Sequence, residues 1–440
     1  MSALESLIAA GGEAPLLDSL SYSIPAASSA VTMRKQHVRA YPTSASTLTP
    51  TGTRTVRVRL GGDDFVDPSS LRIQYTLQNL DANRNLCPSC GPHGPWGQVR
   101  LLSSGVELDN LPSYNRHHEL HGWRLLTMEQ QASEACFGWA SAWPDQRVAG
   151  YGPHPNQGYL APGASLTVSF KPLLSIFTSG KAIPLRYMPL EWEGTLCPAG
   201  DWTNVNDYAA QPAAASRNYA ISDIQFVYDS LVLDEAVQES FYKSLLSNRV
   251  LSIPTTLFTQ ITTTIAPGAT SFSTNLVRAF SRLSHVWVTF CGPAGDNTQL
   301  ATSFVNPTTQ DAQLVASWKL RPRFGAEQAC VLARLQIGPL NVPDPSPAGP
   351  NMQELFWMLQ KALPATPYLD RADFAAQTFV IPFDLRRTPG DPTSALSTRS
   401  GDLVRLDIKN MTADVAQTCI ITMWSMAVVS IREQGITLLS

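Results

Sequence analysis

Cys87 and Cys90, in the string CPSCGPH, have the spacing most typical of metal or redox chemistry in this chain. A structural zinc site needs four ligands, and a redox CxxC pair lies next to a βαβ unit. The sequence contains neither a second CxxC pair nor that pattern. Beyond His93, the candidate ligands are distant along the chain: His117, His118, His121 and Cys136. We therefore interpret residues 87–93 as a surface loop rich in Pro and Gly, and we expect no metal and no cofactor.

The histidine string HHELH, residues 117–121, does not match the HExxH motif of zinc proteases. Glu119 is followed by Leu120 and then directly by His121. No pair of histidines has the H-x-H spacing of cupin-type metal sites. His117 and His121 are four residues apart and can share one face of a helix. We expect this pair to be solvated or partly packed.

Glu191 and Glu193, in the string LEWEGTL, alternate onto one face of an expected strand. Glycosidases use two carboxylates about 5 to 9.5 Å apart, a separation that this spacing allows. Alternation also places Leu190 and Trp192 on the opposite face, which we expect to point inward. The two glutamates then face water or a neighbouring subunit. We therefore predict no catalytic residue and no enzyme activity.

Three further surface features have simple interpretations. Aromatic residues in long loops suit glycan stacking, but loop packing or subunit contact is favoured: Trp139, Trp143, Trp202 and Tyr208. A basic cluster near the N-terminus is interpreted as a solvated segment: Arg34, Lys35, His37 and Arg39. Asn410 begins a glycosylation triplet, which we expect to be idle because no secretory signal is visible.

The composition of the 440 residues favours many short strands. Charged residues make up 15%, hydrophobic residues 44%, and 33 Pro with 27 Gly punctuate the chain. A formal net charge of -3 is unlike that of a protein that wraps a polyanion, so we expect no sequence-specific contact with nucleic acid. The odd number of cysteines, 7, indicates reduced thiols.

Period-two alternation recurs along both halves of the chain, as in TVRVRL from Thr55 and LRIQYTL from Leu71. Expected strands in the first half are 55–60, 71–77, 99–108, 165–170, 190–196 and 221–233. Those in the second half are 255–265, 285–290, 314–320, 331–337, 378–385, 403–408 and 418–431. Each half contains a helix candidate, one after Ser113 and one from Asn351. We interpret the repeated order as a structural duplication of one β sandwich.

The domain boundaries follow from this order. Residues 1–50 are predicted to be an N-terminal arm, 51–233 the first sandwich, 234–249 a connecting helix and 250–440 the second sandwich. Asp234 is the expected N-cap of a helix that ends at Leu246. Its apolar side chains share one face: Val237, Phe241, Leu245 and Leu246. We expect this helix to pack between the two sandwiches as a rigid connector.

Two stretches resemble a known family. The segment ISDIQFVYDSLVLDEAVQESFYKSLLSNRVLSIP, residues 221–254, and NLVRAFSRLSHVWVTF, residues 275–290, are similar to the junction of the double jelly-roll major capsid proteins. These proteins come from eukaryotic double-stranded DNA viruses, both nucleocytoplasmic large viruses and polinton-like viruses. The resemblance implies an all-β fold of two consecutive eight-stranded antiparallel jelly-rolls with short inserted helices.

The same resemblance implies a function and partners. The chain would form pseudo-hexagonal homotrimers that tile an icosahedral virus shell. It would contact neighbouring capsomers, penton and minor capsid proteins, and an inner membrane through the N-terminal arm. Its location would be the virion, after synthesis in the host cytoplasm or nucleus. Two alternatives stay open: a two-jelly-roll carbohydrate-active hydrolase or glycan-binding protein, and a minor structural or vertex protein of the same viruses.

Overall fold

A computed structural model shows the arrangement of the chain. It describes residues 32–44, 46–86, 88, 91–121, 160–203, 215–233, 235–246, 250–291, 332–342, 352–363, 380–388, 394–399, 403–409, 416–432 and 435–439. The predicted strand at 314–320 lies outside these residues.

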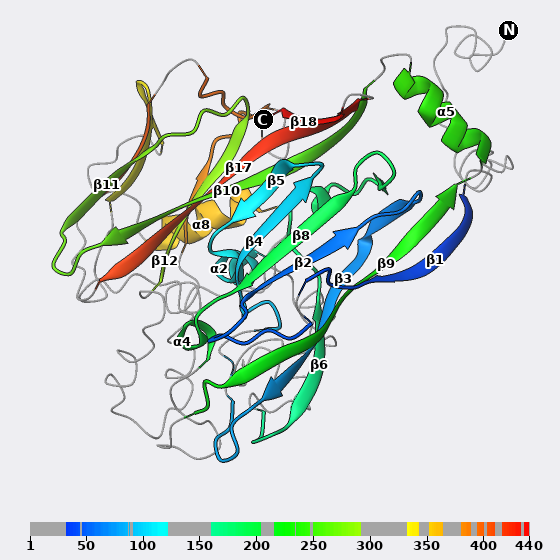
Figure 1. Ribbon diagram of the computed structural model, residues 1–440. Coiled ribbons are helices and arrows are strands. Elements are labelled where there is room, and N and C mark those ends of the chain that lie inside the picture. The colour runs from blue at the N-terminus through cyan, green and yellow to red at the C-terminus, as the bar shows by residue number, and fades with distance from the viewer. Residues whose placement is uncertain are drawn as a thin grey trace, which may run out of the picture.

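The first half of the chain forms a barrel of two four-stranded antiparallel sheets (Figure 1). One sheet has the order β1-β9-β3-β6, with the short β7 (Ile183–Pro184) on β3, and the other has the order β2-β8-β4-β5. The bounds are β1 (Thr32–Ala40), β2 (Thr55–Leu60), β3 (Phe65–Asn79), β4 (Trp96–Ser103), β5 (Val106–Leu111), β6 (Ser165–Phe170), β8 (Leu190–Leu196) and β9 (Tyr219–Leu233). The strict alternation of exposed and buried residues along β2 shows why TVRVRL is a strand with one face in the core.

The second half repeats the same topology. Its sheets have the orders β10-β17-β12-β15 and β11-β16-β13-β14. The bounds are β10 (Leu251–Ile265), β11 (Ser271–Leu276), β12 (Leu283–Cys291), β13 (Leu332–Ile337), β14 (Leu340–Val342), β15 (Val380–Asp384), β16 (Val404–Lys409) and β17 (Gln417–Arg432). In both barrels the first strand pairs with the last and the second with the seventh, which is the jelly-roll order. The prediction of two consecutive eight-stranded jelly-rolls is confirmed.

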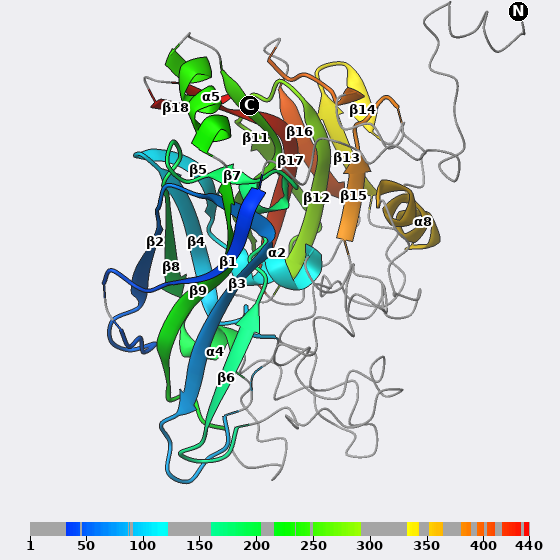
Figure 2. The ribbon, with the colours of Figure 1, turned by 90° about the vertical axis from the view of Figure 1, so that its right-hand side faces the viewer.

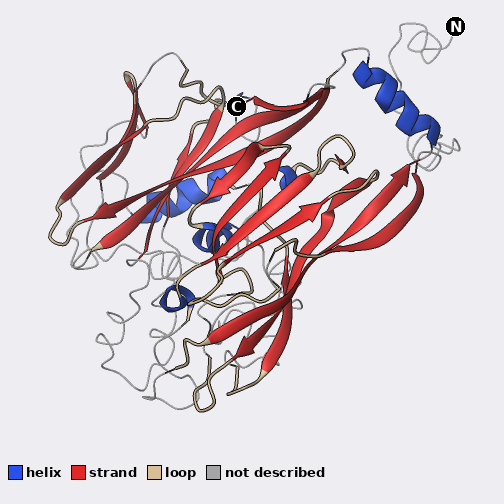
Figure 3. Cartoon of the chain, viewed as in Figure 1, coloured by secondary structure: helices blue, strands red, loops and turns tan. Residues whose placement is uncertain are grey.

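Helices occupy connections between the strands (Figure 3). They are α2 (Tyr114–Glu119), η4 (Ile176–Thr178), α4 (Ala199–Trp202), α5 (Glu235–Leu246) and α8 (Met352–Ala362). The expected helix from Asn351 is α8, whose Leu355 and Leu359 are buried in the second core. None of the helices in the described ranges is long and apolar enough to span a bilayer.

The predicted arm, residues 1–50, is wrong over part of its length. Thr32–Ala40 is β1, the first strand of the first barrel, and it pairs along its length with β9. The reason lies in its position at the edge of the sheet. Among its described side chains, Val38 and Ala40 pack on the core, while Gln36, His37 and Arg39 are exposed. The sequence TMRKQHVRA has no sustained apolar alternation that would predict a strand.

The connection between the barrels is a shared sheet. Residue Thr259 of β10 pairs in parallel with Asn110 of β5, so that sheets from both barrels form one nine-stranded sheet. The C-terminal strand β18 (Gly435–Leu439) adds to the far end of β17. Side chains from this end of the second barrel pack in the core of the first: Leu251, Ile253, Val429, Ile431, Ile436 and Leu438. The two barrels are therefore joined by backbone pairing and by apolar packing.

The role predicted for the connecting helix is wrong, although the helix is present. Figure 1 shows α5 at the outer end of the molecule, beyond the ends of β9 and β10, and Figure 2 shows it in front of the barrels rather than between them. Tyr242 and Leu246 are each 47% exposed, and Leu245 is buried. The side chains of Val237 and Phe241 lie outside the described part. The helix joins β9 and β10 at the periphery. The shared sheet and the shared core, rather than this helix, hold the two barrels together.

Ile431→Ala should destabilise the protein by about 2 to 5 kcal/mol, because it opens a cavity in a core. Ile431 is 1% exposed and belongs to a strand of the second barrel, yet it packs in the first. The urea midpoints of both barrels should therefore fall together. The matched control is Arg432→Ala, at an exposed neighbouring position, with an expected change within about 0.5 kcal/mol. A loss below about 1 kcal/mol for Ile431→Ala would contradict the shared core.

Candidate functional site at the junction of the barrels

Helix α2 is one of the elements of the first barrel that contact the second. It follows β5 directly, and Ser113 holds the N-cap position that the sequence suggested, although its side chain makes no capping bond. Instead, the Ser113 backbone N–H donates to Oε1 of Gln260 on β10, at 3.1 Å. This bond attaches the N-terminal end of α2 to β10, and His117 and His121, which follow, contact strands of the second barrel.

His117 and His121 pack against aromatic side chains of the second barrel. The ring centroid of His117 is 4.8 Å from that of Phe258 on β10. The ring of His121 lies 4.6 Å from Trp287 on β12 and 5.0 Å from Trp424 on β17. Trp287 and Trp424 stack at 4.9 Å. We call these five residues, with His285, the histidine–tryptophan seam.

His285 completes the seam from β12. Its ring is 5.2 Å from that of Trp424, and its Nε2 is 3.7 Å from Oδ1 of Asp384, too far for a hydrogen bond. Nε2 of His285 and both ring nitrogens of His117 and His121 are buried with no hydrogen-bond partner in the described part of the chain. Imidazoles in such surroundings are neutral, since burial disfavours their charged form.

Burial lowers the pKa of each of these histidines. It lowers the pKa of His117 from 6.5 to about 3 and that of His285 from 6.5 to about 4. It also holds the pKa of His121 well below its ordinary value, and the nearby His117 and His285 act in the same direction. Two neutral imidazoles of the first barrel, His117 and His121, therefore contact aromatic rings of the second barrel, and the neutral His285 packs on Trp424 from within the second barrel.

A second histidine group lies inside the first barrel. Nε2 of His93 is 2.8 Å from Oε2 of Glu119, and both side chains are buried. His118 stacks on His93 at 4.2 Å and donates from Nε2 to the carbonyl oxygen of Lys171. The structure thus brings His93 and the HHELH string together. Their contacts are ring packing and hydrogen bonds. Within the described ranges, no group of three or more His, Cys, Asp or Glu side chains is arranged to hold a metal ion.

Two polar contacts also link elements near the junction. Oδ2 of the buried Asp109 accepts bonds from Ser175 N at 2.8 Å and Ser175 Oγ at 2.6 Å. The carbonyl oxygen of Ser175 accepts a bond from Oγ1 of Thr255 in the second barrel. Burial raises the pKa of Asp109 from 3.8 to about 6, although the Ser175 bonds act against this rise.

Next to the seam, a cavity of about 230 Å³ is lined by both barrels. Arg116 donates to Oδ1 of Asp201 at 2.7 Å at its wall, and both side chains are largely buried. Cys197 of the first barrel and Cys291 of the second also line it. Burial raises the pKa of both thiols, so neither has the thiolate character of a reactive cysteine.

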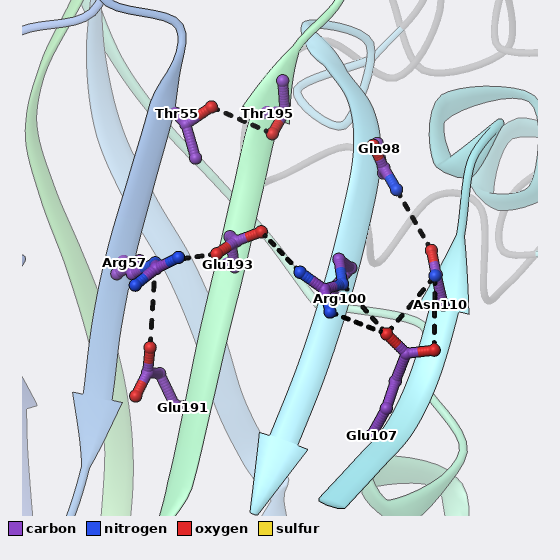
Figure 4. A network of polar contacts seen from close by, with 9 residues as sticks. All are labelled: Thr55, Arg57, Gln98, Arg100, Glu107, Asn110, Glu191, Glu193 and Thr195. Carbon is purple, nitrogen blue, oxygen red and sulfur yellow. Dashed lines mark hydrogen bonds and ion pairs between the residues drawn. The ribbon is translucent and has the colours of Figure 1, made fainter. Parts of the chain in front are cut away.

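Glu191 and Glu193 belong to a charged network on the outer face of the first barrel (Figure 4). Oε2 of Glu193 accepts from Arg57 Nε at 2.7 Å, and Oε1 accepts from Arg100 Nη1 at 3.2 Å. Arg100 also donates to Glu107, while Glu191 lies 3.8 Å from Arg57. Leu190 and Trp192 point into the core, as the alternation predicted. The network crosses the strands β2, β8, β4 and β5 and occupies both oxygens of Glu193.

The loop aromatic residues and the basic cluster lie in different parts of the fold. Trp202, considered as a loop aromatic, is fully buried and packs on Tyr219 with ring centroids 5.2 Å apart. Of the basic cluster, His37 and Arg39 are exposed on β1 and contact Asp229 and Gln225. The side chains of Arg34 and Lys35 are not described. Several candidates lie outside the described residues: Cys87, Cys90, Cys136, Trp139, Trp143, Tyr208 and Asn410.

Solved structures share this arrangement of two barrels. A chain of the Sputnik virophage superposes with a TM-score of 0.62 at 10% identity, covering 97% of this chain and 92% of the other. A chain of the PBCV-1 virus capsid gives a TM-score of 0.60 at 14% identity, covering 92% of this chain and 96% of the other. The Faustovirus major capsid protein gives a TM-score of 0.58 at 8% identity, covering 99% of this chain and 96% of the other. The fold is a double jelly-roll.

The similarity of the double jelly-roll is visible in structure and not in sequence. No protein-family model and no curated protein matches the chain. At these identities the solved structures establish the fold, which extends over both barrels. The histidine–tryptophan seam was not predicted from the sequence, because its residues from α2 and the turn after it contact residues more than a hundred positions later. The strings HVWVTF and MWSM, which carry Trp287 and Trp424, gave only a strand signal.

Within the charged network, Glu193→Gln should cost about 1 kcal/mol of unfolding free energy, because it removes the carboxylate between two guanidinium groups. The Glu193 side chain is 11% exposed. Its matched control is Glu191→Gln, at a side chain that is 43% exposed, with an expected change within about 0.3 kcal/mol. Urea unfolding at low and high salt measures the loss of unfolding free energy in both variants. High salt should reduce the loss caused by Glu193→Gln. Equal losses at both positions would show that burial does not distinguish them.

Proposed function

We propose that this double jelly-roll chain is a major capsid protein, which assembles as pseudo-hexagonal homotrimers into an icosahedral virus shell. The observation that carries the proposal is similarity over both barrels to a chain of the PBCV-1 virus capsid and to the Faustovirus major capsid protein. It covers more than nine tenths of each chain, so the likeness extends beyond a single barrel.

The junction supports this proposal physically. Two barrels of the same topology, joined through one sheet and a shared core, present two similar lobes at a fixed angle. Closed threefold association of three such chains places six similar lobes in a ring. A unit of that outline packs edge to edge into a sheet or shell. A flexible connection would not hold the lobes in this arrangement.

We propose a structural rather than an enzymatic role. The carboxylates that suggested a glycosidase, Glu191 and Glu193, are engaged by arginines. The histidines that suggested metal chemistry form apolar and hydrogen-bonded contacts. These contacts support a structural role over a glycosidase, whereas the loop aromatics Trp139, Trp143 and Tyr208 of the glycan-binding alternative lie outside the described residues. We retain the domain division at residues 233–234 and 249–250 as part of this proposal.

The proposed partners are neighbouring capsomers, penton and minor capsid proteins, with the virion as the location. Residues before β1 are proposed to contact an inner membrane or minor proteins. Thr32 at the start of β1 pairs with Leu233, the last residue of β9, so the chain enters the first barrel close to α5. A role in sequence-specific binding of nucleic acid is not proposed, in view of the net charge of -3.

The purified chain should form a stable homotrimer, because a permanent capsomer interface buries several thousand Å² with an apolar centre. Light scattering should give a particle of three times the chain mass of 47.9 kDa, which persists on dilution to nanomolar concentrations. Electron micrographs should show pseudo-hexagonal units. A monomer at micromolar concentration, with no tendency to form sheets or shells, would overturn the capsid proposal and favour the hydrolase.

Deletion of residues 1–30 should leave the trimer intact and impair shell formation. The deleted segment ends before β1, so both barrels retain all their strands. The measurement is the ratio of trimers to shells in light scattering and micrographs. The control is a deletion that extends through residue 40, which removes β1 and should unfold the first barrel. Normal shells from the shorter deletion would contradict a role of this segment in assembly.

A further inference from the structure

We propose that the histidine–tryptophan seam is an acid-sensitive latch, in which protonation of His117, His121 and His285 separates α2 of the first barrel from β10, β12 and β17 of the second. The proposal concerns the isolated chain and does not depend on the capsid function.

Geometry is the first support. The His117 and His121 rings are 4.6 Å apart, and each contacts an aromatic ring of the other barrel. Their ring nitrogens are buried without partners among the described residues. An imidazolium at either position would lack a hydrogen-bond acceptor among the described residues, and two would repel each other at close range. His121 is half-buried, but both of its ring nitrogens are buried, so protonation accompanies opening of the seam.

The neighbouring charges do not compensate. From β10 and β17, the contacts to the seam histidines come from Phe258 and Trp424, which carry no charge. Asp384, at the end of β15, is the carboxylate closest to His285, at 3.7 Å, and it is engaged by Arg386 at 2.7 Å. Asp384 thus offers His285 partial compensation at most.

The other titratable groups around α2 have partners elsewhere. Arg116 bonds to Asp201, and Glu119 bonds to His93. His118 is bonded to Lys171 and faces the first core, and burial holds its pKa well below the ordinary value as well. Asp109 on β5 acts in the opposite direction, because its raised pKa favours the folded state as the pH falls toward 4.

The sign of the pH effect follows from linkage. The pKa of each seam histidine is lower in the closed state than the ordinary value of 6.5. An open state, with solvated imidazoles, therefore binds more protons. The stability of the closed seam is complete above pH 6.5 and is lost as the pH falls toward about 4 for His285 and about 3 for His117.

Thiol labelling measures the opening, because one cysteine of the second barrel lines the junction and another lies in the core of that barrel. Cys291 lines the junction cavity, whereas Cys419 is fully buried in the core of the second barrel. A dipyridyl disulfide reagent that reacts in acid is applied to the full chain between pH 7 and pH 4, and peptide mass spectrometry reports each cysteine. Opening of the seam should label Cys291 while Cys419 stays protected, together with a fall in tryptophan fluorescence from Trp287 and Trp424.

The opening constant should rise by up to about tenfold per pH unit for each histidine released, so three histidines give up to about a thousandfold. The double variant His117→Leu, His121→Leu should lower this slope by up to about a hundredfold per pH unit, because two proton sites are lost. The matched control, His37→Leu at the exposed edge strand, should keep the wild-type slope. Asp109 is present in all variants, so its contribution to the pH dependence of the opening constant is the same in each and cancels in the comparison.

Two results would overturn the latch. One is an unchanged slope in the double variant, and the other is labelling of Cys291 and Cys419 together at every pH, which indicates global unfolding. Should the double variant not fold, the single variant His285→Leu serves the same purpose, with an expected loss of up to about tenfold per pH unit. An unchanged slope in that variant, with no fluorescence change in the wild-type chain down to pH 4, equally overturns the proposal.

Discussion

The relative orientation of the two barrels depends on one physical constraint: side chains from one end of the second barrel must fill the core of the first barrel. The nine-stranded sheet passes from β5 to β10 at Asn110 and Thr259, and the end of the second barrel fills the core of the first. Packing of this kind is intolerant of displacement, since interiors are packed as densely as crystals. The position of α2, the seam and the cavity beside it all follow from that shared core.

Period-two patterns predicted a duplicated β sandwich, because many strands bury one face, whereas the double jelly-roll was predicted from the family resemblance of residues 221–254 and 275–290. The alternation in β2, β3 and β8 appears directly in their burial. The edge strand β1 was not predicted, since TMRKQHVRA has no sustained alternation of apolar residues. The helix α5 was identified, although its predicted N-cap, Asp234, lies outside the described residues. Its position depends on the pairing of β5 with β10, which leaves no trace in local sequence.

The junction shows where sequence reasoning ends. His117 and His121 were noticed for their spacing, and we expected a solvated or partly packed pair. Their actual partners, Phe258, Trp287 and Trp424, come from three strands of the other barrel. Only the tertiary arrangement distinguishes an imidazole that binds a metal from one that packs on an indole. The chemical type of a residue therefore predicted less here than its place in the topology.

The pairing of β5 with β10 has a consequence for solubility at high concentration. An open strand edge presents unpaired N–H and C=O groups to any other chain, and β proteins need devices that prevent such edges from associating. Contact between the two barrels covers part of one edge on each. At the edge formed by β1, exposed His37 and Arg39 oppose unwanted strand addition by their polarity and charge. Fusion of two barrels in one chain thus gives protection against edge-to-edge aggregation that two separate barrels would lack.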